Sequence, residues 1–127
     1  GYNGSSHGCV NTRSWDGMSY LFDSARIGDK VEYDALASVF GSRLPPVTAN
    51  KSLIGHAMGA SSAIEAILAI EGMQRGRLLP TLHHTPDPEI AFDVVAEGTR
   101  RLEQTFVLKN AFGFGGCNAC IVLERRR

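Results

Sequence analysis

The sequence predicts one α/β domain covering residues 1–127, and three observations support this. The length suits a single domain, because single hydrophobic cores usually form at roughly 100 to 200 residues. Hydrophobic residues make up 43% of the chain and charged residues 20%, the composition of a globular protein. Segments with the helical spacing of apolar residues alternate with short apolar runs that favour strands.

The first third of the chain is predicted to form a strand, a helix and an extended segment. The run SYLFDSA (19–25) is apolar and ends in turn-forming residues, which indicates a buried strand from about Tyr20. Asp29 is a plausible N-cap with Glu32 three residues later, and Gly41 would end the helix. The residues at helical spacing are Val31, Ala35, Leu36, Val39 and Phe40. RLPPVTAN (43–50) should be extended, because proline disfavours the helical region for itself and its predecessor.

A second helix is predicted near KSLIGHAMGAS (51–61), ending before Gly72. Its apolar positions are Ala60, Ala63, Ile64, Ile67, Leu68 and Ile70. Because polar residues are few, we expect this helix to be buried on most sides. LLPTLHHTPDPEI (78–90) is a proline-punctuated connection, followed by the strand candidate AFDVV (91–95).

The C-terminal segment predicts two strands joined by a glycine-rich turn. The strand-like runs are Phe106–Ala111 and Asn118–Leu123. Gly113, Gly115 and Gly116 lie between them in FGFGGCN, where backbone N–H groups could approach an anion closely. A simple tight hairpin is the alternative interpretation.

Charge, hydropathy and cysteine content narrow the function classes. Thirteen basic residues balance thirteen acidic ones, so no bulk attraction to nucleic acid follows, and the final arginines are predicted to be a solvated end. The polar N-terminal segment does not resemble a signal peptide, and no apolar run approaches the roughly 20 residues that span a membrane. We expect a cytoplasmic protein. Cys9, Cys117 and Cys120 are odd in number and are predicted to be thiols.

Lys51 and His56 are the candidate catalytic residues. His56 precedes a predicted helix, whose free N–H groups and dipole disfavour an imidazolium. A neutral imidazole with one nitrogen held could polarise a carbonyl group through the other N–H. The alternatives are a structural histidine and a solvated lysine. The pair Cys117 and Cys120 is not expected to bind metal, since residues three apart on a strand point to opposite faces.

Several segments resemble, in order and spacing, the C-terminal half of β-ketoacyl-acyl-carrier-protein synthases. They are GDKVEYDALASVFG (28–41), NKSLIGHAMGASSAIEAILAI (50–70), LPTLHHTPDPEI (79–90) and KNAFGFGGCNACIVLERR (109–126). The K-S-x-x-G-H and F-G-F-G-G motifs together are specific. The resemblance implies the C-terminal half of a thiolase-like fold, a mixed sheet flanked by helices, truncated at its N-terminal side and usually found in a dimer.

The resemblance also implies a mechanism, decarboxylative Claisen condensation. A cysteine in the N-terminal half takes an acyl group, and the enolate formed from a malonyl thioester attacks it. His56 matches the second of two histidines that stabilise the enolate oxygen, and Lys51 organises its surroundings. Phe114, flanked by Gly113 and Gly115, matches the phenylalanine that gates the acyl pocket and offers its N–H to an oxyanion. No metal or cofactor is implied, because substrates arrive on the phosphopantetheine arm of acyl carrier protein.

Two departures from the family pattern keep three hypotheses open. YLFDSARIGD (20–29) has neither the first catalytic histidine nor the adjacent threonine, and none of the cysteines sits in the nucleophile motif. The chain could pair with a half that bears the nucleophilic cysteine. It could instead be a chain-length-factor-like subunit of an active ketosynthase, as Asp23 and Ala25 suggest, or an acyl or carrier-protein binding module. Each predicts a hetero- or homo-oligomer without nucleic acid or membrane, and no condensation by this chain alone.

Overall fold

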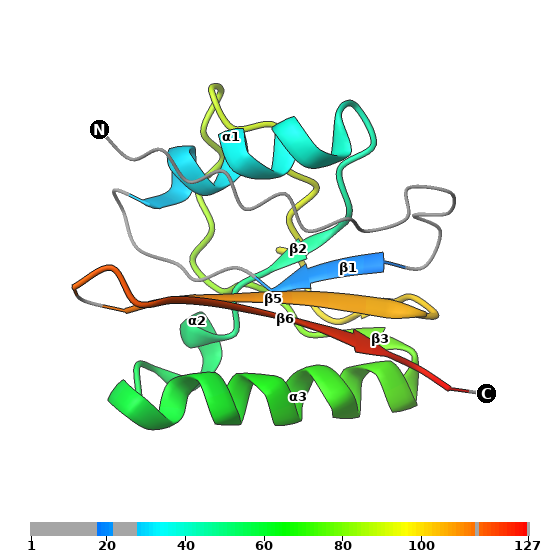
Figure 1. The fold of residues 1–127 in the computed structure, drawn as a ribbon. Coiled ribbons are helices and arrows are strands. Elements are labelled where there is room, and N and C mark those ends of the chain that lie inside the picture. Colours follow the sequence, from blue (N-terminus) through cyan, green and yellow to red (C-terminus); the bar gives the residue numbers. More distant parts are fainter. Residues whose placement is uncertain (1–17, 22–27, 114, 127) are drawn as a thin grey trace.

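The computed structural model describes residues 18–21, 28–113 and 115–126, which form three layers (Figure 1). A four-stranded sheet lies between α1 (Gly28–Phe40) on one face and α3 (Ser61–Arg75) on the other. The strand order is β2-β1-β5-β6, formed by Val47–Thr48, Met18–Leu21, Phe106–Phe112 and Asn118–Glu124. The first three strands are parallel and β6 is antiparallel, so the predicted mixed sheet flanked by helices is confirmed.

Two short helical elements and a small second sheet complete the fold. The helix α2 (Lys51–Ile54) and the 3₁₀ turn η1 (Met58–Ala60) connect β2 to α3. After α3, β3 (Arg77–Leu78) pairs antiparallel with β4 (Arg100–Arg101). The strand predicted at 91–95 is reduced to a single bridge between Val47 and Val94, in which Val47 N–H donates to the Asp93 carbonyl and Val95 N–H to the Val47 carbonyl.

The strand β5 separates two hydrophobic cores because its side chains alternate between the faces of the sheet. Phe106 and Leu108 pack against the α1 core, whereas Val107 packs against α3. The α1 core consists of Leu36, Phe40, Val47 and Ala49, and the α3 core of Ala69, Met73 and Val107. Lys109 is two positions after Val107 on the same strand, so the alternation also places Lys109 on the α3 side of the sheet.

The helix α1 confirms the prediction for 29–41, but its start and its buried face differ from it. The helix begins at Gly28, so Asp29 lies in its first turn and is not the N-cap. Glu32, Leu36 and Phe40 form the buried row, at i, i+4 spacing. Val31 and Val39, expected to be core residues, are 67% and 55% exposed, because each lies about 100° around the helix from that row.

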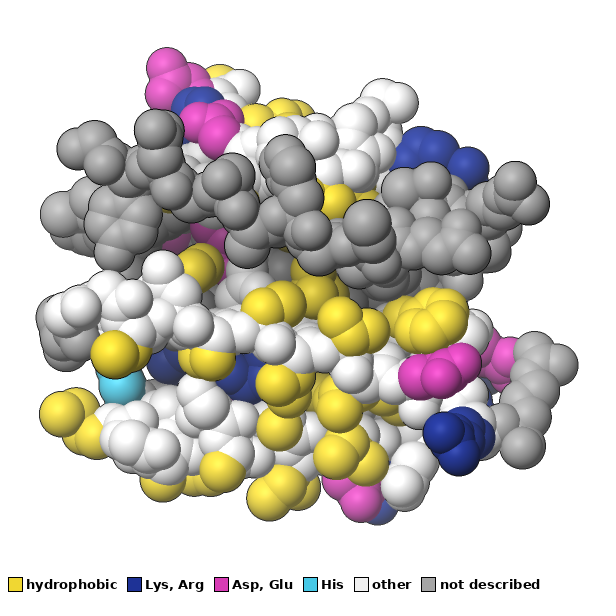
Figure 2. All heavy atoms as spheres, in the orientation of Figure 1, with side chains coloured by type: hydrophobic (Ala, Val, Ile, Leu, Met, Phe, Trp, Pro, Cys, Tyr) yellow, Lys and Arg dark blue, Asp and Glu magenta, His cyan; other side chains and the backbone are white. Residues whose placement is uncertain are grey.

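The helix α3 extends beyond Gly72 and buries one side only. It ends at Arg75, where Gly76 is left-handed at φ 60° and its N–H caps the last turn. Ser61, Glu65, Ala69 and Met73 form its buried row. The expectation of burial on most sides is wrong, since Ile64, Ile67 and Ile70 are at least 36% exposed. Figure 2 shows apolar side chains gathered across α3 and the neighbouring strand, a surface typical of an interface.

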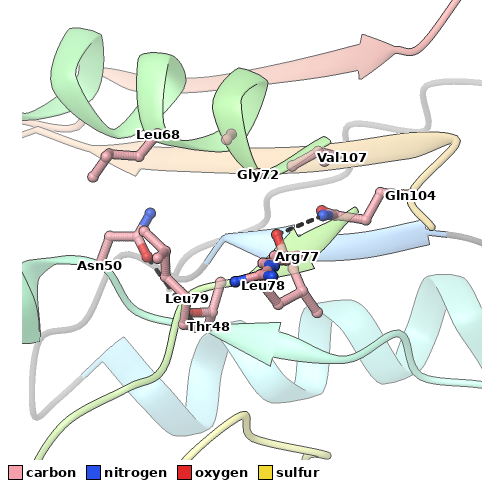
Figure 3. Close-up of a pocket in the computed structure, with 10 residues that line it drawn as sticks. Thr48, Asn50, Leu68, Gly72, Arg77, Leu78, Leu79, Gln104 and Val107 are labelled. Atoms are coloured by element: carbon pink, nitrogen blue, oxygen red, sulfur yellow. Dashed lines mark hydrogen bonds between the residues drawn. The ribbon is translucent and has the colours of Figure 1, made fainter. Parts of the chain in front are cut away.

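Gly72 lies inside α3 because a strand backbone passes close to it. A Cβ at this position would lie 2.7 Å from the carbonyl oxygen of Arg77. That oxygen also accepts a hydrogen bond of 2.9 Å from Gln104 Nε2, so it is fixed in place (Figure 3). The glycine therefore serves close packing, and the prediction that it ends the helix is wrong.

Gly72→Ala is expected to destabilise the chain by about 1–3 kcal/mol, the usual effect of overpacking. This outcome opposes helix propensity, which favours alanine over glycine by about 1 kcal/mol. Urea unfolding followed by circular dichroism measures the difference. Gly59→Ala is the matched control, because nothing lies within 4 Å of a Cβ there. A stabilised Gly72→Ala variant would contradict the close approach.

Candidate functional site

Lys51 and His56 are placed by a short helix and a glycine turn in front of α3. Lys51 begins α2, and the N–H of Gly55 donates to the Lys51 carbonyl at 2.9 Å. Gly55 has φ 73° and ψ −173°, a conformation that favours glycine and ends the helix after one turn. His56 follows immediately and is exposed. The local sequence therefore brings both candidate residues to the N-terminal end of α3.

One nitrogen of the His56 ring is held by the turn. The backbone N–H of Met58 donates to Nδ1 at 2.9 Å, and Ser61 Oγ lies 3.1 Å from the same atom. Because Nδ1 accepts from a backbone N–H, the geometry assigns the ring proton to Nε2. His56 can thus donate one hydrogen bond from Nε2 to a group outside the turn.

Met58, whose N–H binds the His56 ring, has a strained backbone conformation. Its φ is +50°, in the left-handed region that residues other than glycine rarely adopt. Met58 is 74% exposed, so burial does not explain the conformation. In this conformation the Met58 N–H donates to the His56 ring, and this hydrogen bond is the contact that offsets the strain.

Met58→Gly is expected to unfold at higher urea concentration than Met58→Ala, by about 1 kcal/mol in unfolding free energy, because alanine retains the left-handed strain. Both variants remove the same exposed side chain, so the comparison isolates the backbone. Chemical denaturation of the two variants measures it. Equal stabilities would show that Met58 is not strained.

A buried carboxylate joins Lys51 to a second lysine. Glu65 Oε1 lies 2.9 Å from Lys51 Nζ, and Glu65 Oε2 lies 3.0 Å from Lys109 Nζ. The side chains are 1%, 12% and 2% exposed for Glu65, Lys51 and Lys109. The three residues come from α3, α2 and β5, and we call them the Lys–Glu–Lys cluster. Figure 2 shows basic side chains recessed beneath the surface in this region, near a histidine.

Glu65 and Lys109 are not among the site residues predicted from the sequence. Glu65 is the one acidic residue in the otherwise small and apolar run 61–70. Lys109 interrupts the strand-like run that begins at Phe106. A charged residue at a position that the periodicity assigns to a buried face is the signal that could have identified both, since such charges are rarely buried without a partner.

The glycine-rich turn connects β5 to β6, as predicted. Gly115 and Gly116 have φ of 84° and 83°, and the Gly113 N–H donates to the Cys117 carbonyl at 2.8 Å. The Gly113 amide is therefore used within the turn. Phe114 lies outside the described residues, as do Asp23 and Ala25.

The described cysteines are free thiols. Cys117 and Cys120 are both unbridged, and burial raises the pKa of the Cys120 thiol. A raised pKa disfavours the thiolate, the form that acts as a nucleophile. Cys9 lies outside the described residues. Within the described ranges, no three His, Cys, Asp or Glu side chains group as a metal site, and no helix is long and apolar enough to cross a membrane.

Comparisons with known proteins agree on one family. Residues 23–85 match the model of the β-ketoacyl synthase C-terminal domain. The chain is 36% identical over 105 residues to 3-oxoacyl-[acyl-carrier-protein] synthase 2 of Staphylococcus aureus, covering 80% of this chain and 25% of that protein. It therefore spans about a quarter of the length of the curated relatives it matches.

Solved structures give the same result. The ishigamide ketosynthase/chain length factor aligns with a TM-score of 0.81 at 31% identity, over 88% of this chain and 28% of that one. A type II polyketide ketosynthase, solved in complex with its acyl carrier protein, aligns with a TM-score of 0.81 at 26% identity, over the same shares. The chain belongs to the β-ketoacyl synthase family and corresponds to part of the C-terminal half of its thiolase-like fold.

Proposed function

We propose that this chain supplies the His56 side of a decarboxylative condensing site in fatty-acid or polyketide synthesis. The observation that supports this most directly is the ring geometry of His56. Its Nδ1 accepts from the Met58 N–H, which leaves Nε2 to carry the ring proton and to act as the donor. Such a donor stabilises an oxygen that gains negative charge during a reaction.

The proposed step starts from a malonyl thioester on acyl carrier protein. The bond between the carboxylate and the α-carbon breaks and CO₂ leaves. The electron pair of that bond stays on the α-carbon and forms the enolate of the thioester. The enolate oxygen accepts the hydrogen bond from His56 Nε2, and the α-carbon then attacks the acyl thioester on a cysteine. That carbon–carbon bond forms as the cysteine thiolate leaves. No metal or cofactor takes part.

Two kinds of partner follow from the proposal. The acyl-bearing cysteine belongs to an N-terminal half or ketosynthase subunit, and the exposed isoleucine side of α3 supports a surface that such a partner covers. The substrate arrives on acyl carrier protein, which is bound to the related polyketide ketosynthase in its solved structure. Assembly with the cysteine half is therefore part of the proposed function.

A chain-length-factor-like role is the second candidate. YLFDSARIGD (20–29) has no histidine, and the structural similarity to the ishigamide ketosynthase/chain length factor also favours this role. In that case the chain pairs with a complete ketosynthase and performs no decarboxylation itself.

The test is reconstitution with a polypeptide that carries the acylated cysteine. The assembled protein is given malonyl-acyl carrier protein, and CO₂ release and ketoacyl product are measured. Release of CO₂ by this assembly supports the condensing site. If CO₂ is released only with a complete ketosynthase, and the rate of release does not depend on His56, the chain-length-factor-like role replaces the condensing role.

A further inference from the structure

Lys109 is buried against the candidate site although no part of the proposed reaction requires it. It lies on β5 on the face that packs against α3, and its side chain is 2% exposed. Its Nζ lies 3.0 Å from Glu65 Oε2 and donates to the Asn110 carbonyl at 3.3 Å. The desolvation of a lysine this deeply buried opposes folding unless good partners compensate for it.

A single lysine would already neutralise the charge of Glu65. The second lysine, Lys109, is therefore not needed for charge balance. It contacts the other oxygen of the Glu65 carboxylate, Oε2. Oε1 lies 2.9 Å from Lys51 Nζ and Oε2 lies 3.0 Å from Lys109 Nζ, so rotation of the carboxylate would lengthen one ion pair or the other. The two contacts thereby favour one position of the Lys51 ammonium relative to Glu65, at the opposite end of α2 from His56.

We propose that Lys109 is a positioning residue of the condensing site, acting through Glu65 to fix Lys51. The proposal rests on the proposed function for its catalytic consequence, but the shared carboxylate is testable without any activity. If Lys109 is removed, Glu65 can turn both oxygens toward Lys51. The ammonium then shifts although its ion pair survives.

The shared carboxylate predicts a specific kind of non-additivity. In Lys51→Met or Lys109→Met, Glu65 keeps one cation, so each single variant shifts the urea midpoint moderately. In the double variant, the buried carboxylate loses both partners. The double variant is expected to lower the midpoint by clearly more than the sum of the single shifts.

Lys30→Met is the matched control for this comparison of single and double variants. It removes the same side chain from an exposed i, i+4 pair with Asp34 on α1, on the other face of the sheet. Combined with Lys109→Met, it should give additive shifts, because the two sites share no partner. Additive behaviour of Lys51→Met with Lys109→Met as well would overturn the shared carboxylate.

The positioning role is tested in the assembly with the cysteine-bearing partner. Lys109→Met is expected to lower kcat for malonyl decarboxylation by up to about 100-fold with KM little changed, the effect of a displaced site group. Lys30→Met should leave both constants unchanged, and Lys109→Arg should recover part of kcat. A kcat for Lys109→Met within twofold of wild type would overturn the positioning role. A wild-type assembly that releases no CO₂ would overturn the proposed function and this role together. Urea unfolding of the single and double lysine variants would still test whether Lys51 and Lys109 share the Glu65 carboxylate.

Discussion

Replacing Glu65 with glutamine is expected to destabilise the chain by about 3–5 kcal/mol, because it removes the negative charge that two buried lysines contact. Lys109 is 2% exposed and Lys51 12%, so neither ammonium can recover full hydration without local unfolding. The total stability of a domain is often only about 5–15 kcal/mol. Glu65→Gln should therefore be the most destabilising conservative substitution in α3.

The measurement is urea unfolding of wild type and Glu65→Gln at equal protein concentration. Glu71→Gln is the matched control, since it makes the same change on the same helix in an exposed pair with Arg75. Exposed i, i+4 pairs contribute about 0.3–0.5 kcal/mol, so this control should be nearly neutral. Similar effects at the two positions would contradict the burial of the Lys–Glu–Lys cluster.

A triple variant separates the charge effect from packing. Lys51→Met, Glu65→Leu and Lys109→Met together remove the cluster and leave apolar side chains of similar length. Because replacement of a buried ion cluster by apolar residues is often neutral or stabilising, the triple variant should recover most of the stability lost in Glu65→Gln. It should not recover the proposed activity.

His56→Ala is expected to lower malonyl decarboxylation by the assembled protein by about 100- to 1,000-fold, the usual effect of removing one oxyanion donor. His56 is exposed, so the substitution should lower the unfolding free energy only by the contribution of the lost hydrogen bond from Met58 N–H, about 0.5–1.5 kcal/mol. The effect should appear in kcat, because the hydrogen bond strengthens as charge develops on the enolate oxygen.

CO₂ release from malonyl-acyl carrier protein is the measurement for this second prediction. His83→Ala is the control, since His83 is an exposed histidine in the connection between β3 and β4. His56→Gln retains an N–H donor and should keep more of the rate than His56→Ala. An unchanged rate in His56→Ala, in an assembly that decarboxylates, would assign the enolate donor to another group.

The sequence alone determined the local parts of this protein. Lys51 and His56 are predicted as a pair from a contiguous motif, and residues so close in the chain come together whatever the rest of the fold does. The helices and the β5–β6 hairpin follow from periods of 3.6 and 2 for the same reason. The resemblance to the family also rests on such contiguous motifs.

The tertiary structure alone decided which faces and which distant residues meet. Glu65 and Lys109 lie far apart in the chain, and they pair only because α3 packs on the face of β5 that presents Lys109. The buried rows of α1 and α3, and the passage of Arg77 beside Gly72, depend on packing in the same way. A helical period limits the possible buried faces but does not choose among them, because that choice depends on which surface covers each helix.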